Sequence, residues 1–130
     1  MPKLTLKDIE RLPKTDLHVH LDGSLRLSTI LELAHEQKVK LPADTPEKLL
    51  PFVSVGDECK SLVEYLKAFD VTLSVMQTYE SLVRTAFELA EDAAKENVRY
   101  IEVRYAPILH QQQGLTLTAI VQAVVEGLKK

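Results

Sequence analysis

The sequence predicts an α/β protein in which two parallel strands are connected and followed by helices. Two stretches, 15–21 and 98–106, alternate apolar and polar side chains with a period of two, which is typical of strands. The residues between and after them place apolar side chains three and four positions apart, which is typical of amphipathic helices. Because a helical connection joins the strands, we expect a parallel pair with a right-handed crossover.

The composition indicates one globular domain that does not bind nucleic acid or membranes. The 130 residues are 45% hydrophobic and 27% charged, and the net charge of −3 offers no basic surface for nucleic acid. The single cysteine, Cys59, excludes an internal disulfide and a zinc site built from cysteines. We expect a cytoplasmic protein, because the sequence has no leader-like segment and no apolar run of membrane-spanning length.

The first strand follows a short helix over Leu6–Arg11, which Thr5 caps, and it divides its side chains between two faces. One face is polar and the other is apolar. The polar face carries Asp16, His18, His20 and Asp22, and the apolar face carries Leu17, Val19 and Leu21.

The two histidines of this strand can bind one metal ion. Residues on one face of a strand lie about 6.5–7 Å apart, so His18 and His20 can lean together and share a zinc ion at about 2.0–2.1 Å per bond. A His-x-His pair also arises by chance. Here Asp22 extends the polar face, and Gly23 then permits a turn. This arrangement favours a strand of a (β/α) barrel, polar at its mouth and apolar toward an outer layer of helices.

Helices fill the connection to the second strand. The stretch Leu27–Gln37 is expected to be helical, with His35 off its apolar side as a surface residue. The expected stripe is Leu27, Ile30, Leu31 and Ala34. Thr45 and Pro46 begin a short helix that we expect to end near Pro51, before an irregular segment over 52–60.

Two longer helices come next. Residues 61–64 form a capping box that opens a helix over 62–76. One face of that helix carries Leu62, Leu66, Phe69, Leu73 and Met76, a pattern that core packing alone would also produce. Thr78 begins the next helix, which Asn97 ends. Its expected inner side carries Leu82, Val83, Ala86, Phe87, Ala90, Ala93 and Ala94.

The second strand, over 98–106, again has one apolar and one polar face. The apolar face carries Ile101, Val103 and Tyr105, and the polar face carries Tyr100, Glu102 and Arg104. Glu102 and Arg104 are expected to pair with each other or with neighbouring strands, because buried charges need partners. After Pro107 ends the strand, His110 and 111–113 are expected in a solvated loop. The final helix begins near Leu117. Its expected inner face carries Ile120, Val121, Val124 and Leu128.

Two stretches resemble one known family. The segment 12–25, Leu-Pro-Lys-Thr-Asp-Leu-His-Val-His-Leu-Asp-Gly-Ser-Leu, is similar to the opening strand of the adenosine deaminases, which belong to the adenosine and adenine deaminase family of metal-dependent hydrolases. The segment 100–107, Tyr-Ile-Glu-Val-Arg-Tyr-Ala-Pro, is similar to their second strand. The resemblance covers nearly the whole chain and implies the N-terminal portion of a (β/α)8 TIM-type barrel.

The resemblance implies a chemistry and a role for each matching residue. His18 and His20 would bind one catalytic Zn²⁺, His20 and Asp22 would bind the substrate, and Asp22 would contact the 5′ end of the ribose. The substrate would be adenosine or deoxyadenosine, and the reaction hydrolytic deamination to inosine and ammonia in purine salvage. A set of side chains would line the pocket entrance: Leu62, Tyr65, Leu66 and Phe69.

The sequence also departs from the family's pattern. No catalytic residue is expected within the chain, since the family's general acid and remaining zinc ligands would lie beyond Lys130. We therefore expect 1–130 to be an incomplete barrel domain that is inactive alone. Two alternatives stay open. One is an adenine deaminase of the same family, which tends to carry glutamate where Asp22 stands, and the other is a non-catalytic fragment.

Overall fold

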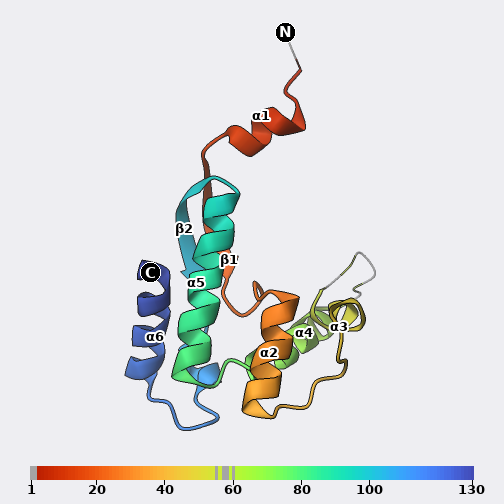
Figure 1. Ribbon diagram of the computed structural model, residues 1–130, viewed down its shortest axis with the longest axis vertical. Coiled ribbons are helices and arrows are strands. Elements are labelled where there is room, and N and C mark those ends of the chain that lie inside the picture. Colours follow the sequence, from red (N-terminus) through yellow and green to blue (C-terminus); the bar gives the residue numbers. More distant parts are fainter. Residues whose placement is uncertain (1–2, 55, 57–58, 60) are drawn as a thin grey trace.

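The computed structural model (Figure 1) describes residues 3–54, 56, 59 and 61–130, except for the side chain of Glu64. In chain order its elements are α1 (Leu6–Arg11), β1 (Lys14–His20), α2 (Leu27–Gln37), α3 (Pro46–Val53), α4 (Leu62–Ser74), α5 (Tyr79–Lys95), β2 (Val98–Arg104), the 3-10 helix η1 (Pro107–His110) and α6 (Leu117–Lys129). The strands β1 and β2 pair in parallel. The predicted fold class, part of a barrel with two parallel strands and several helices, is confirmed.

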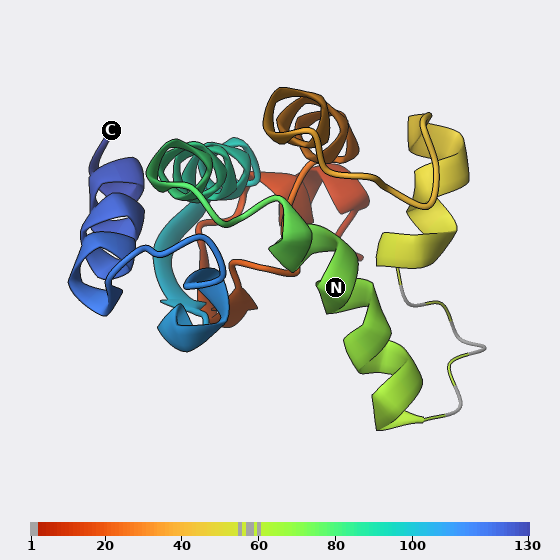
Figure 2. The ribbon, with the colours of Figure 1, turned by 90° about the horizontal axis from the view of Figure 1, so that it is seen from below.

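The helices pack on one side of the strands and around their carboxyl ends. Helix α5 runs along the sheet beside β2, and α6 packs alongside α5 (Figures 1 and 2). Because the strands are parallel, both end at the same edge of the sheet, and η1 follows β2 directly after that edge. Helix α1 stands apart at the opposite end and buries no residue. No helix in the described part of the chain is long and apolar enough to cross a bilayer.

The predicted helix starts are confirmed where a threonine caps the first turn. The hydroxyl oxygens of Thr5, Thr45 and Thr78 accept hydrogen bonds from backbone N–H groups three residues later. Helix α5 ends as expected, because Asn97 adopts a left-handed conformation with φ 62°. The start of α4 at Leu62 also agrees with expectation, but its capping box involves the Glu64 side chain, which lies outside the described atoms.

Two helix ends differ from expectation. Helix α3 passes Pro51 and reaches Val53, because the N–H of Ser54 still donates to the Leu50 carbonyl at 2.8 Å beyond the proline. Helix α4 stops at Ser74, two residues before Met76, which is fully buried in the connection to α5.

The expected alternation along β1 is interrupted by a bulge. Asp16 pairs with Ile101 and Val19 pairs with Val103. Three residue steps along β1 therefore match two along β2 in this stretch. Asp16 therefore lies on the face of the apolar Ile101 and is half-buried, and the prediction that it shares the histidine face is wrong. Its Oδ1 accepts the backbone N–H of His18 at 3.2 Å, which stabilises the irregular turn of chain.

The core differs from the predicted stripes because some polar residues are inside. The predicted inner-face residues that the structure leaves exposed are Leu17, Phe87, Ala94 and Val121. On α5 their places are taken by Ser81, Thr85 and Glu88, which are buried with hydrogen bonds. Glu88, for example, accepts the Thr29 hydroxyl of α2 at 2.6 Å. A hydrogen-bonded polar side chain can thus occupy a position that periodicity assigns to an apolar one.

Helices α5 and α6 approach each other closely at Gly127. A Cβ added at Gly127 of α6 would lie 2.3 Å from the Val83 carbonyl oxygen and 2.7 Å from the Ala86 Cβ. No side chain fits there without moving one helix, since the nearest atom belongs to the α5 backbone. Gly127 is therefore required by the closeness of the two helices.

We predict that Gly127→Ala lowers the free energy of unfolding by about 1–3 kcal/mol, because overpacking forces the helices apart. The measurement is thermal or urea unfolding of the two proteins side by side. Gly56→Ala is the matched control, since a Cβ at Gly56 meets nothing within 4 Å. Equal stability of Gly127→Ala and the parent chain would contradict the close packing.

Candidate metal and ligand site

The imidazoles of His18 and His20 converge at the carboxyl end of β1. Their Nε2 atoms are 3.2 Å apart, and their ring centroids are 5.2 Å apart. The predicted arrangement of both rings on one face is confirmed. His20 pairs with Arg104 in the register, so this face is the polar face of β2 as well. Arg104 and Glu102 make no ion pair with each other among the described residues, and Glu102 instead accepts the Tyr100 hydroxyl at 3.0 Å.

This pair of nitrogens fits a zinc ion in its spacing. Two tetrahedral Zn–N bonds of about 2.0–2.1 Å place their nitrogens roughly 3.3 Å apart, close to the 3.2 Å between His18 and His20. Within the described residues no group of three or more His, Cys, Asp or Glu side chains could hold a metal. The donors present therefore match two positions of a coordination sphere.

Asp22 lies directly beyond the pair and is 6% exposed. Its Oδ1 is 3.6 Å from Nδ1 of His20 and has no hydrogen-bond partner in the described structure. Two hydrogen bonds to backbone carbonyls hold this part of the chain in place. The Ser24 hydroxyl donates to the His20 carbonyl at 2.5 Å, and the N–H of Leu21 donates to the Arg104 carbonyl at 2.9 Å.

A cavity of about 400 Å³ opens beside Asp22. It is lined by Asp22, Gly23, Leu25, Leu27, Leu50, Val53, Ser54, Tyr65, Ala68, Phe69 and Thr72. Of the four residues expected at a pocket entrance, Tyr65 and Phe69 line this cavity. Leu62 and Leu66 do not, since they lie on an outer turn of α4 and are 71% and 51% exposed.

Phe69, which lines the cavity, also contacts His20. Its ring centroid is 6.1 Å from that of His20, in an edge-to-face arrangement. A Cβ at Gly23 would come within 3.4 Å of the Phe69 ring. This is an ordinary van der Waals distance, and Gly23 has no positive φ, so the turn conformation expected from the sequence does not require a glycine here.

Ion pairs fasten the segment after Asp22 to α5. The Arg26 guanidinium bonds the carboxylates of Glu91 and Asp92. The hydrogen bond from Arg26 lowers the pKa of each of these carboxyl groups below its usual range, and the same bonds raise the pKa of Arg26. This clamp fixes the start of α2 and with it the path of the chain that carries Asp22.

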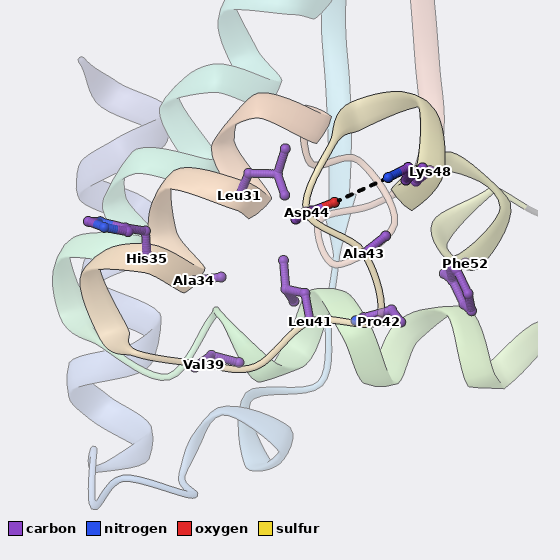
Figure 3. Close-up of a pocket in the computed structure, with 10 residues that line it drawn as sticks. All are labelled: Leu31, Ala34, His35, Val39, Leu41, Pro42, Ala43, Asp44, Lys48 and Phe52. Carbon is purple, nitrogen blue, oxygen red and sulfur yellow. Dashed lines mark ion pairs between the residues drawn. The ribbon is translucent and has the colours of Figure 1, made fainter.

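A larger cavity, of about 800 Å³, has neither His18 nor His20 in its lining (Figure 3). It lies between the end of α2, the following loop and α3, and its polar residues include His35 and an Asp44–Lys48 ion pair at 3.9 Å. His35 is exposed, as expected. None of the residues around this cavity belongs to the histidine face, so we place the candidate site at the smaller cavity.

The environment of His110 differs from the one predicted from the sequence. This residue was expected in a solvated loop, but its side chain is fully buried in η1. Its Nδ1 lies 2.9 Å from the Met76 carbonyl, and because a carbonyl only accepts, Nδ1 carries the proton. Burial lowers the pKa of His110, against smaller opposing effects of the Met76 bond and the Asp22 charge. A usable signal was its place directly after a strand's carboxyl end, where barrel sites gather.

Gln77 completes a junction with His110 between α4 and η1. Its amide nitrogen donates to the Leu109 carbonyl at 3.0 Å, and its Oε1 accepts the Gln112 N–H at 3.0 Å. Gln77 is 2% exposed. The connection after α4 is therefore tied to the carboxyl end of β2, and this sets the position of α4 beside the cavity.

The comparisons with known proteins agree on one family. The family model described as Adenosine deaminase matches residues 13–130. The chain is 50% identical over 123 residues to an adenosine deaminase of Clostridium botulinum (strain 657 / Type Ba4), covering 95% of this chain and 37% of that relative. The chain thus spans just over a third of the length of the curated relatives it matches.

Solved structures give the same picture. The Arabidopsis N6-mAMP deaminase MAPDA is 34% identical with a TM-score of 0.76, over 96% of this chain and 36% of that one. An adenine deaminase from Arthrobacter aurescens is 27% identical with a TM-score of 0.78, over 90% and 35%. An amidohydrolase from Burkhoderia ambifaria with bound Zn, 24% identical with a TM-score of 0.77 over 98% and 35%, shares the fold.

We predict that His110 makes folding stability fall in mild acid. Its pKa is about 6.5 in the unfolded chain and lower in the folded one. Below about pH 6.5 the unfolded state binds the proton first, so stability declines by up to about 1.4 kcal/mol per pH unit until the folded pKa is reached. Above pH 6.5 this contribution is fully present.

The measurement compares unfolding at pH 7.5 and pH 5.5 for the parent chain and His110→Gln, whose amide can still donate to the Met76 carbonyl. The parent should lose more stability than the variant over this interval. An identical pH dependence in both proteins would rule out a neutral, buried His110.

Proposed function

The chain belongs to the adenosine deaminase family, and on that premise we propose that it forms part of the active site of a zinc-dependent hydrolase that converts adenosine to inosine and ammonia in purine salvage. The observation that carries this proposal is the 3.2 Å approach of two imidazole nitrogens at the carboxyl end of a parallel strand. In barrels of this class, active sites lie at that end of the strands. The family membership and the donor geometry support the same chemistry.

We assign a role to each residue of the site. His18 and His20 hold the zinc ion through Nε2, and His20 also borders the nucleoside. When bound, zinc acts in such hydrolases as a Lewis acid and makes a nucleophile available from water near neutral pH. Asp22 accepts a hydrogen bond from the ribose hydroxyl, and Phe69 and Tyr65 form an apolar wall that limits water around the base. None of the 130 residues is assigned as the general acid.

The size of Asp22 supports a nucleoside over a free base. Aspartate is one methylene shorter than the glutamate that adenine deaminases tend to carry here, and the carboxylate faces a cavity of about 400 Å³. The related solved structures are named as deaminases of N6-mAMP and of adenine, so adenine is the second candidate substrate. Rates with adenosine, deoxyadenosine, N6-methyl-AMP and adenine, measured on a complete enzyme that contains this chain, decide between them.

We also propose the cytoplasm as the location. One cysteine permits no internal disulfide, which is usual for proteins of reducing compartments. The proposed partner is a small nucleoside, and the net charge of −3 gives no support to a nucleic-acid partner.

We predict that His18→Ala and His20→Ala each remove zinc and activity together in the complete enzyme. With one of its few protein ligands lost, the site binds the zinc ion no better than water does. Metal analysis with a coupled ammonia assay measures both quantities. His35→Ala is the matched control, since His35 is exposed on α2 and away from the site. Full zinc content in either site variant would contradict the assignment.

We predict that the 130-residue chain alone binds zinc weakly and releases no ammonia from adenosine. Two imidazoles are fewer than the three protein ligands of a usual catalytic zinc site, and no larger donor group exists among the described residues. The same two assays apply to the purified chain. Turnover by zinc-loaded chain, free of any full-length enzyme, would show that the residues assigned here are not the whole machinery.

A further inference from the structure

We propose that Asp22 has a second role as a positioning residue: it fixes the tautomer of His20, so that the Nε2 lone pair of that imidazole is presented to His18 and to a metal. Its relevance to the metal rests on the proposed function. The tautomer itself is a property of the metal-free chain. The role of Asp22 toward the nucleoside alone would require no such effect.

The three side chains form a line of polar atoms. Oδ1 of Asp22 is 3.6 Å from Nδ1 of His20, and Nε2 of His20 is 3.2 Å from Nε2 of His18. The two ring nitrogens of His20 thus face different neighbours. One faces a carboxylate, and the other faces the position where the two imidazoles converge.

Donor and acceptor chemistry orders the protons along this line. An ionised carboxylate only accepts hydrogen bonds, so it favours the proton of His20 on Nδ1. A neutral imidazole with its proton on Nδ1 has a lone pair on Nε2. In the metal-free chain that lone pair can accept from His18, whose proton then lies on Nε2. The hydrogen bond of one ring nitrogen thereby decides which nitrogen can bind metal.

The burial of Asp22 favours a hydrogen bond between its carboxylate and His20. Its side chain is 9% exposed, whereas that of His20 is 48% exposed. The Oδ1 atom has no hydrogen-bond partner in the described structure, and an unsatisfied buried acceptor is unfavourable. A small movement of either side chain shortens 3.6 Å to a hydrogen bond.

The surrounding chain keeps the two groups in register. The Ser24 hydroxyl donates to the His20 carbonyl, and the Phe69 ring lies edge-to-face with the His20 ring at 6.1 Å between centroids. The Arg26 clamp fixes the segment that follows. Metal-binding histidines commonly donate their second N–H to a carboxylate, and loss of that carboxylate typically weakens metal binding 10–100-fold.

The first test reads the tautomers by ¹⁵N NMR of the imidazole nitrogens in the metal-free chain at pH 7.5. We expect the proton of His20 on Nδ1 and that of His18 on Nε2. Asp22→Ala should shift the His20 population toward Nε2–H, while Asp22→Asn, which retains an acceptor oxygen, should restore the Nδ1–H form. Asp70→Ala, an exposed carboxylate on α4, is the control and should change nothing.

The second test measures Zn²⁺ and Co²⁺ affinity of the same four proteins. We expect a loss of about 10–100-fold in Asp22→Ala, partial recovery in Asp22→Asn, and no change in Asp70→Ala. A His20 proton on Nε2 in the parent chain overturns the inference, even if Asp22→Ala does not fold. Unchanged metal affinity in a folded Asp22→Ala overturns it as well. Absence of deamination in a complete enzyme would overturn the proposed function and leave the tautomer result intact.

Discussion

The pairing of β1 with β2 is the constraint on which the site depends. The pairing is closed at both ends, by the Lys14 N–H on the Asn97 carbonyl at 3.0 Å and by the Leu21 N–H on the Arg104 carbonyl at 2.9 Å. Between these fixed ends the two strands have the same length, because the step that β1 gains between Asp16 and Val19 offsets the step that it loses between Lys14 and Thr15. The strand therefore reaches His20 in register with Arg104. His18 and His20, two residues apart at this end, share one face of the sheet.

Two polar anchors then set the walls of the cavity against this strand. The Arg26 clamp ties the segment after Asp22 to α5, and the junction of His110 with Gln77 ties the end of α4 to η1. Both anchors join segments that are far apart in the sequence. The apolar wall at Phe69 is consequently held in place by hydrogen bonds that lie outside the cavity.

Local signals were enough to predict the parts of the fold that local chemistry determines. The threonine caps of α1, α3 and α5, the stop at Asn97 and the full extent of α2 follow from residues within one helical turn. The histidine pair was found for the same reason, since two residues on one strand share a face.

The errors fall where distant contacts decide. Burial of His110 depends on a carbonyl 34 residues earlier in the chain, and burial of Glu88 depends on Thr29, 59 residues earlier. Period two also assumes a regular strand, so it placed Asp16 with the histidines although the bulge turns it to the other face. Helical periodicity likewise could not tell that only the last turns of α4 reach the core, which left Leu62 and Leu66 exposed.

The two roles proposed for Asp22 are compatible because a carboxylate has two oxygens with about four acceptor positions. Oδ1 faces His20, so Oδ2 remains for a ribose hydroxyl, which needs only an acceptor. The two roles are then coupled through one charge. A hydroxyl that donates a hydrogen bond to this carboxylate competes with His20 for the same acceptor, so it weakens the preference of the His20 proton for Nδ1. A nucleoside and a free base would therefore act differently on the metal-binding pair, since only the nucleoside brings the hydroxyl.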